Sequence, residues 1–306
     1  MTATARPAAP AVSAAAIVER RQPLRPARIV LYAFLTFMAV TWLFPLLWAL
    51  FASLRPYRDT LANGYISVPQ ILNLDNYAQA WTQGEFAKFY LNSLIVAVPA
   101  VILTLFLASM VAFAVTRFSW KFNLLCLMIF TAGNLLPQQV IIVPLYRLYL
   151  LLPLPAPLSD NGVVYDQYFG IILIHIAFQT GFCVFVLSNY MKTLSKELTE
   201  AALVDGAPVR KIYWNVILPL CRPALAALAT LEFTFIYNDF FWALTLMKSG
   251  DKRPITSALG NLQGAFFTDT NLLAAGAMLA AIPSILVYLA LQRQFIRGLS
   301  LGSSKG

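Results

Sequence analysis

The chain has 306 residues, of which 59% are apolar and 11% are charged, with a net charge of +9 and a mean hydropathy of +0.70. A soluble domain carries about 25% charged residues, so this composition excludes an ordinary soluble globule and predicts a chain surrounded by lipid. The positive charge does not suggest a nucleic-acid partner, because membrane topology and attraction to anionic lipid headgroups account for it.

The N-terminal residues 1–27 are rich in Ala, Pro and Arg and show no apolar periodicity, so we expect a disordered tail. The apolar run that follows is longer than the h-region of a signal peptide, and no A-x-A cleavage site comes after it. We therefore expect no cleaved signal peptide ahead of the membrane domain, which we place at 28–296.

Six apolar runs are each long enough, at about 20 residues or more, to cross the hydrocarbon core as a helix. They lie at about 29–54, 89–116, 122–146, 167–191, 223–247 and 270–292. Only the fifth contains charged residues, which are Glu232 and Asp239. Open sheets cannot span a bilayer and barrel strands are only about 10 residues long, so we predict an all-α membrane protein with six transmembrane helices.

Lys and Arg are distributed unequally between the two sides of these helices. The side that holds both termini, loop 117–121 and loop 192–222 has 15 basic residues, against seven on the other side. In multi-pass proteins the cytoplasmic loops carry the basic excess. We therefore predict a bacterial-type plasma (inner) membrane protein with both termini and loop 192–222 in the cytoplasm.

No pattern in the sequence indicates a catalytic, cofactor or metal site. The phosphate-binding pattern GxxxxGK[ST] does not occur, so we do not expect this chain to hydrolyse ATP. The single histidine, His175, lies in a predicted span. Cys126, Cys183 and Cys221 lack the spacing of a disulfide or of metal ligands, and we expect them to pack as small apolar residues.

Loop 192–222 contains the signals of a helix start and a helix stop. Ser195 is placed to cap a helix whose first turns hold Glu197 and Glu200, where carboxylates favour the helix dipole. Gly206 predicts the end of this helix, because glycine adopts the left-handed conformation of a helix stop at little cost. One narrow face of the helix combines small and apolar residues with one acid: Leu194, Leu198, Ala201, Ala202 and Asp205.

A second helix is predicted at 208–218, with Pro208 in its first turn and Pro219 ending it. The loop then reads as two short helices along the membrane surface. Such a pair of helices can dock on another protein, because small side chains let the helix approach a groove of the partner closely while the carboxylate supplies one charged contact. The alternative is an amphipathic surface helix whose apolar face merely lies on lipid headgroups.

Twenty residues of this loop follow a known pattern. From Glu200 to Pro219 the sequence reads EAALVDGAPVRKIYWNVILP. It resembles the cytoplasmic coupling loop of binding-protein-dependent ABC importers, whose pattern is EAA, three residues, Gly, nine residues and Ile-x-Leu-Pro. Val216 stands where the pattern has Ile. The matching residues are Glu200, Ala201, Ala202, Gly206, Leu218 and Pro219.

Residues 28–306 as a whole resemble the second permease subunit of a carbohydrate ABC importer, of the maltose-permease type. Five further segments carry the resemblance: SLRP (53–56), NSL (92–94), PQQVIIVPLY (137–146), YNDFFWAL (237–244) and RGLSLGSSKG (297–306). Tyr237 departs from the Trp that members often have, and residues 300–302 depart from endings such as Thr-Ala-Gly. The family implies the six-helix transmembrane domain of a type I ABC importer.

This resemblance also implies a set of partners. They are a second, homologous permease subunit, two copies of a nucleotide-binding ATPase subunit, an extracytoplasmic solute-binding protein and a carbohydrate substrate, all in membrane lipid. ATP and Mg would be held by the ATPase, so this chain would be non-catalytic and without a cofactor of its own. The cytoplasmic tail 297–306 would reach the ATPase subunits. The residues implied in ATPase coupling are Glu200, Ala201, Ala202, Asp205, Gly206, Leu218 and Pro219.

Polar groups inside spans are costly in lipid, so they are expected to face a cavity or another helix. In the third span they lie around Pro137, which is expected to kink the helix. Together with aromatic rings they form the kind of surface that binds sugars, and Phe235, Asp239 and Trp242 would share one helix face. The candidate substrate pathway comprises Asn134, Gln138, Gln139, Glu232, Asn238, Asp239 and Trp242. Alternatively, Glu232 and Asp239 pair with the second permease subunit and the amides hold helices together.

The sequence therefore predicts a membrane-spanning permease subunit of an ATP-driven, binding-protein-dependent sugar importer, coupled to its ATPase through 195–219. One alternative changes only the cargo, to a polyamine, phosphate or an amino acid. Another is an ion-coupled secondary carrier that would use Glu232, Asp239 and His175 as a proton path. That alternative leaves the pattern at 200–219 unexplained.

Overall fold

The computed structural model describes residues 26–134, 136–263 and 268–300. The chain divides into two parts, 1–48 and 49–306, which are described separately. The first part contributes most of α1 (Pro26–Ser53), whose 28 residues give a length of about 42 Å at 1.5 Å per residue. That length exceeds the ~30 Å hydrocarbon core of a bilayer. The predicted tail at 1–27 lies outside the described residues except for its last two, and so does most of the tail predicted at 297–306.

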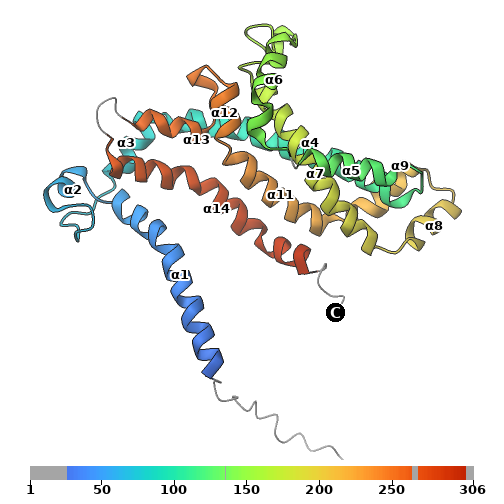
Figure 1. Ribbon diagram of the computed structural model, residues 1–306, viewed down its shortest axis with the longest axis horizontal. Helices are drawn as coiled ribbons and strands as arrows, with labels where there is room; N and C mark the ends of the chain where they lie inside the picture. Colours follow the sequence, from blue (N-terminus) through green and yellow to red (C-terminus); the bar gives the residue numbers. More distant parts are fainter. Residues whose placement is uncertain (1–25, 135, 264–267, 301–306) are drawn as a thin grey trace, which may run out of the picture. The chain divides into compact units, whose positions relative to one another are not determined.

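The second part is built around α4 (Phe86–Arg117), α7 (Tyr168–Thr193), α11 (Arg222–Tyr237) and α14 (Thr270–Ser300) (Figure 1). α4 packs against α7 and α11, and α11 packs against α14. Four small residues of α4 are fully buried: Ala97, Ala100, Ala108 and Ala112. Small residues let helix backbones approach closely, which is how helices associate when lipid offers no hydrophobic driving force.

These helices confirm the predicted all-α membrane fold. α1, α4, α7 and α14 are each long and apolar enough to cross a bilayer, and two sharply bent helix pairs raise the number of candidate spans to six. Over the described residues the backbone forms no β-strand, only one isolated bridge between Pro153 and Val163. The largest number of candidate spans therefore equals the six predicted.

The third predicted span, 122–146, is two helices rather than one. α5 (Asn123–Gly133) and α6 (Gln138–Leu151) are bent by 94° relative to each other. Pro137 stands directly before α6 in an extended conformation, with ψ at 130°. Because proline lacks an N–H and also disfavours the helical conformation of the residue before it, the predicted kink is a break.

The fifth predicted span, 223–247, is also interrupted. α11 ends at Tyr237, and a separate short helix, α12 (Phe241–Leu246), follows. The Asp239 carboxylate accepts a hydrogen bond from the backbone N–H of Ala243 at 3.1 Å and so caps the first turn of α12. The prediction of one continuous helix was wrong here, because this side chain competes for backbone groups that a continuous helix would use.

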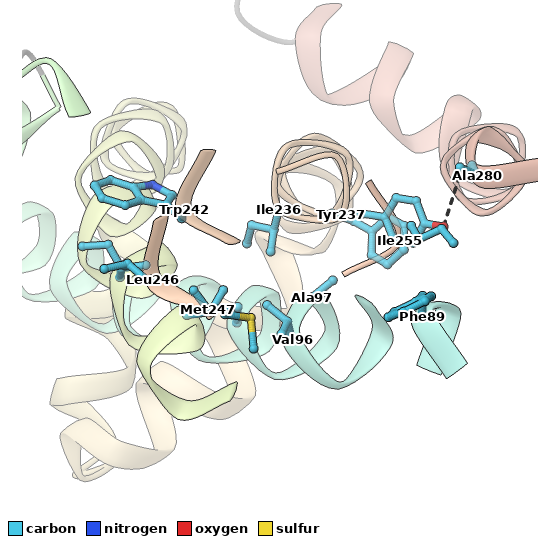
Figure 2. Close-up of a cluster of buried hydrophobic side chains, with 14 of the residues drawn as sticks. Phe89, Val96, Ala97, Ile236, Tyr237, Trp242, Leu246, Met247, Ile255 and Ala280 are labelled. Carbon is cyan, nitrogen blue, oxygen red and sulfur yellow. Dashed lines mark hydrogen bonds between the residues drawn. The ribbon is translucent and has the colours of Figure 1, made fainter. Parts of the chain in front are cut away.

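A buried hydrophobic cluster joins α4, α11, α12 and α14 (Figure 2). Trp242, Tyr237 and Phe89 are among its largest buried side chains. The Tyr237 ring stacks on Phe233 with the centroids 5.4 Å apart, and its hydroxyl donates to the carbonyl oxygen of Ala280 at 3.1 Å. This bond satisfies a buried hydroxyl and so stabilises the contact between α11 and α14.

Short helices occupy the loops. Those before α4, before α7 and between α11 and α14 are α2 (Tyr57–Asn63), α3 (Asp75–Gln83), η1 (Ala156–Leu158), α12, η3 (Gly250–Lys252), α13 (Ile255–Ala258) and η4 (Leu259–Leu262). Loop 192–222 holds α8 (Glu197–Val204), α9 (Val209–Lys211), the π-helical η2 (Ile212–Ile217) and α10 (Leu218–Leu220).

Hydrogen bonds between loops tie each end of the bundle together. At one end the Arg117 guanidinium donates to the carbonyl oxygen of Met191 at 2.7 Å, which joins the end of α4 to the end of α7. At the other end the Asp166 carboxylate accepts from the backbone N–H of Ser249 at 3.0 Å. Loop 192–222 therefore lies at the same end as the loop that follows α4, as the charge-based topology requires.

A buried arginine organises the segment between α1 and α4. Arg55 is only 1% exposed, and all five N–H groups of its guanidinium are used. Nε donates to Asp59 Oδ2 (2.7 Å), Nη1 to the carbonyl oxygens of Gly64 and Ser67 (3.0 and 3.3 Å), and Nη2 to the Asp59 carbonyl and Ser67 Oγ (3.0 and 2.7 Å). Burial tends to raise the pKa of Asp59, but hydrogen bonds, first among them that from Arg55, hold it below its usual value.

The backbone of Arg55 is held as firmly as its side chain. Its carbonyl oxygen accepts from the amide groups of Asn76 in α3 and Asn271 in α14, at 2.8 and 2.9 Å. Asn76 also donates to the carbonyl oxygen of Ser53 at 3.0 Å, and Asn271 to that of Ala52 at 3.1 Å. The SLRP segment at 53–56 is therefore the point where α3 and α14 meet.

Candidate functional site

The first helix of loop 192–222, α8, begins where the sequence predicts. Ser195 Oγ accepts a hydrogen bond from the backbone N–H of Glu197 at 3.1 Å. Glu197 and Glu200 occupy the first turn, where unpaired N–H groups favour carboxylates. Ser195 thus bonds to the start of the helix as predicted, but it lies one residue before the N-cap position, which Lys196 occupies.

The end of α8 is a complete Schellman motif. The N–H of Ala207 donates to the carbonyl oxygen of Ala202 at 3.0 Å, and the N–H of Gly206 donates to that of Leu203, also at 3.0 Å. Gly206 has φ of 74°, in the left-handed region that L-residues other than Asn and Asp rarely adopt. The predicted stop at Gly206 is confirmed, and its left-handed backbone sets the direction in which the chain leaves α8.

The second helix of the loop runs over Val209–Leu220 and differs from the prediction at both ends. Pro208 stands before it in an extended conformation, and Pro219 lies inside it rather than ending it. The reason is the π-helical segment η2, in which the N–H of Leu218 donates to the carbonyl oxygen of Tyr213, five residues earlier. This wider turn makes room for the ring of Pro219, which would collide with the carbonyl four residues earlier in an α-helix.

This second helix is anchored on α4. Ile212 and Ile217 are fully buried. The hydroxyl groups of Tyr213 and Ser109 share a buried hydrogen bond of 2.7 Å. Sequence reasoning missed Ser109, although a polar residue inside a long apolar run is itself a signal of a buried polar contact. The loop is thus packed onto the membrane helices and does not hang free.

The residues predicted for ATPase coupling fall into two groups. The first group belongs to α8 and the turn that ends it: Glu200, Ala201, Asp205 and Gly206 are exposed, and Ala202 is half-buried. The second group, Leu218 and Pro219, belongs to the second helix and is half-buried. No ion pair joins Glu200 or Asp205 to another residue in the part of the chain that the structure describes. Glu200 in α8 and Asp205 at its C-cap therefore present unneutralised carboxylates at the surface, beside small side chains.

Glu232 is fully buried between α11 and α7. The Cys183 thiol donates to its Oε1 at 3.3 Å, while Oε2 has no hydrogen-bond partner among the described residues. Cys183 was expected to pack as a small apolar residue, and the structure shows that it is also a hydrogen-bond donor. Glu232 thus contacts a side chain of its own chain and does not line an open cavity.

A second polar contact lies between α7 and the end of α11. His175 Nε2 is 3.8 Å from Asp239 Oδ2, and this nitrogen has no hydrogen bond among the described residues. His175 is 4% exposed. Asp239 therefore faces a histidine within the chain, and its pairing with a second subunit stays a prediction.

Trp242 belongs to the hydrophobic core. It is 1% exposed and packs on Phe178 of α7 with ring centroids 5.4 Å apart. Phe235 is 56% exposed. The prediction that Phe235 and Trp242 share a face with Asp239 was wrong, because the chain leaves the helix after Tyr237.

The four amide side chains of the predicted pathway are more accessible. Gln139 and Asn238 are exposed, and Asn134 and Gln138 are half-buried. Asn134 and Gln138 flank the break between α5 and α6, and Asn238 lies at the break after α11. The structure therefore places the accessible polar groups at interruptions of the helices, where unpaired backbone groups also occur.

One of these breaks depends on a close helix contact. A Cβ atom added at Gly181 of α7 would lie 2.1 Å from the carbonyl oxygen of Phe130 and 2.2 Å from Nδ2 of Asn134. We expect Gly181→Ala to push α5 away from α7 and to lower the thermal unfolding midpoint in detergent by roughly 5 °C. Gly133→Ala on α5 is the matched control, since nothing lies within 4 Å of its Cβ position. Equal midpoints for the two variants would contradict the contact.

Comparison with known proteins places this geometry in a family. Residues 100–301 match the family described as "Binding-protein-dependent transport system inner membrane component". The chain is 32% identical over 282 residues to the arabinooligosaccharides transport system permease protein AraQ of Halalkalibacterium halodurans, covering 90% of this chain and 94% of that protein. It is 31% identical over 274 residues to the diacetylchitobiose uptake system permease protein NgcG of Streptomyces coelicolor, covering 89% of this chain and 87% of that protein.

A solved structure supports the fold. The chain resembles a chain of a bacterial ABC transporter involved in the import of the acidic polysaccharide alginate, with a TM-score of 0.73 and 22% identity. The match covers 87% of this chain and 95% of the other. The helices described above therefore follow the predicted type I importer fold over most of their length.

Proposed function

The chain belongs to the family of binding-protein-dependent transport system inner membrane components, and we propose that it is the permease subunit of an ATP-driven sugar importer. The family match carries the proposal, because residues 100–301 include the whole coupling pattern at 200–219. Relatives named for arabinooligosaccharides and diacetylchitobiose favour a carbohydrate over a polyamine, phosphate or an amino acid. Family membership also argues against the ion-coupled secondary carrier.

The proposed assembly contains a second permease subunit, two ATPase subunits and an extracytoplasmic binding protein, with both termini of this chain in the cytoplasm. The sequence supports the need for an ATPase partner, since it lacks a phosphate-binding loop. The partner would dock on α8, where Glu200 and Asp205 have no ion-pair partner among the described residues. A basic rim on the ATPase groove would complement these two carboxylates.

Coupling follows from how the loop is held. α8 leads through the Gly206 turn into a helix that is buried on α4 through Ile212, Ile217 and Tyr213. A push on α8 is therefore expected to move α4 and α11 together with it, because closely packed helices do not deform independently. Leu218 and Pro219 lie near the end of this second helix, next to the 73° bend between it and α11.

For the substrate pathway we propose a smaller set than the sequence suggested. Gln139 and Asn238 are exposed, Asn134 and Gln138 are half-buried, and all four lie at or next to a helix break, so a sugar hydroxyl could reach them. Glu232, Asp239 and Trp242 would act indirectly, by fixing the helices that carry these amides. Substitutions that test contact with the sugar would therefore begin at these four amide side chains.

The proposal predicts ATP-dependent uptake of an oligosaccharide. Cells that carry the transporter genes, with or without this chain, are given radiolabelled arabino-oligosaccharide and diacetylchitobiose. Uptake of at least one sugar is expected to require this chain, to stop when ATP is depleted and to persist when a protonophore collapses the proton gradient. Uptake that follows the proton gradient and survives loss of the ATPase subunit would contradict the proposal.

A further inference from the structure

Two adjacent cavities open on the second helix of loop 192–222. The first, of about 470 Å³, lies between this helix and α4. The second, of about 480 Å³, is lined by residues of the same helix and by Pro208 just before it. Arg210 and Trp214 line both cavities, so the two cavities adjoin. Their other lining residues differ.

The first cavity is aromatic. Its walls include Phe106, Phe113, Phe118, Tyr213 and Trp214. Trp214 stacks on Phe106 with centroids 6.1 Å apart, which bridges the loop and α4. The Tyr213 hydroxyl is already bonded to Ser109, so it adds no unpaired polar group to the wall. A hydrocarbon chain is the ligand that such a surface accepts without a desolvation cost.

The second cavity is basic. It brings together Arg210, Lys211 and the amide of Asn215. Neither Arg210 nor Lys211 forms an ion pair with any residue in the described ranges. No acidic residue lines either cavity. Two unneutralised cations beside an amide donor fit a phosphate group.

We propose that these two cavities together bind one anionic phospholipid, with its phosphate between Arg210 and Lys211 and one acyl chain against the aromatic wall. The charge complementarity and the paired apolar and basic surfaces fit a single amphipathic anion better than either cavity fits a ligand alone. The charge-based topology places this end of the bundle in the cytoplasm, where anionic lipid attracts basic segments next to the membrane. Trp214 at the boundary between the two cavities suits an interfacial position.

A lipid in this position would touch both α4 and the second helix of the coupling loop. It would therefore brace the loop against the bundle through the Phe106–Trp214 contact. The inference does not depend on the proposed function, because it concerns only the surface of this chain.

The test measures contact between Trp214 and lipid. The full chain, with the subunits that co-purify with it, is placed in nanodiscs that contain rising fractions of phosphatidylglycerol or phosphatidylcholine brominated on the acyl chains. Bromine quenches tryptophan fluorescence on contact, and the Trp214 signal is the difference between the wild type and Trp214→Phe. We expect brominated phosphatidylglycerol to quench Trp214 at lower fractions than brominated phosphatidylcholine does. Arg210→Gln is expected to weaken the apparent affinity for phosphatidylglycerol roughly five-fold.

Lys192→Gln is the matched control, because it removes an exposed charge at the same end of the bundle but lines neither cavity. It should leave the affinity unchanged. Equal quenching by the two lipids, or an equal loss in Lys192→Gln and Arg210→Gln, would overturn the proposal. So would the absence of any quenching at Trp214, which would mean that a protein segment covers the cavities.

Discussion

Gly206→Val is expected to reduce ATP-driven transport at least about ten-fold while the chain still inserts into the membrane. Gly206 has φ of 74°, and a left-handed conformation costs an L-residue roughly 1–2 kcal/mol, with β-branched residues worst placed. Nothing lies within 4 Å of the Cβ position, so the effect comes from the backbone and not from a clash. The strained turn would no longer hold α8 at the angle that its partner needs. Sugar uptake and the amount of chain in the membrane are measured together.

Three further variants separate coupling from folding. Gly206→Asn should transport within about two-fold of the wild type, because asparagine tolerates the left-handed conformation. Glu200→Lys changes only an exposed side chain and should still reduce transport, whereas Glu197→Lys, one turn earlier on α8, should reduce it less. Normal transport by both Gly206→Val and Glu200→Lys would show that α8 is not the coupling element.

Arg55→Met is expected to loosen the whole segment between α1 and α4. The change removes five hydrogen bonds and leaves the Asp59 carboxylate without its ion-pair partner. Removing one partner of a buried pair is more damaging than removing both. Limited proteolysis within loop 57–74 should become about ten-fold faster. Because the folded pKa of Asp59 lies below its usual value, the contribution of this pair is complete near neutral pH and is lost only in acid.

The double variant Arg55→Met/Asp59→Asn supplies the control. It removes the unpaired charge and should recover part of the lost protection. Asp59→Asn alone should be milder than Arg55→Met, since the guanidinium keeps its bonds to Gly64 and Ser67. If Arg55→Met leaves proteolysis unchanged, the buried network does not stabilise this segment.

Local chemistry explains what could be predicted from the sequence. The cap at Ser195 and the stop at Gly206 involve residues within a few positions of each other, so their signals are complete in the sequence. The all-α membrane fold follows in the same way from the length of the apolar runs. By contrast, hydropathy averages over a window and cannot show that Asp239 caps a new helix inside such a run.

The candidate substrate pathway shows the same limit. An aromatic residue beside polar ones suggested a sugar surface at Trp242, but the break after Tyr237 turns that ring into the core. The partners that decide this, Phe178 for Trp242 and Cys183 for Glu232, lie about 50 or more residues away in the sequence. Only the packing of α7 against α11 and α12 brings them together, and no local pattern encodes it.

The π-helical segment η2 carries one residue more per turn than the helix on either side of it. Deleting a single residue within Ile212–Ile217 would restore a regular helix and leave the residues before it facing the same way, because the wide turn already takes up the extra residue. The regular helix would, however, bring the ring of Pro219 against the carbonyl oxygen four residues earlier. The length of η2 and the proline at position 219 are therefore linked, and we expect a one-residue deletion in η2 to be tolerated only when Pro219 is replaced as well.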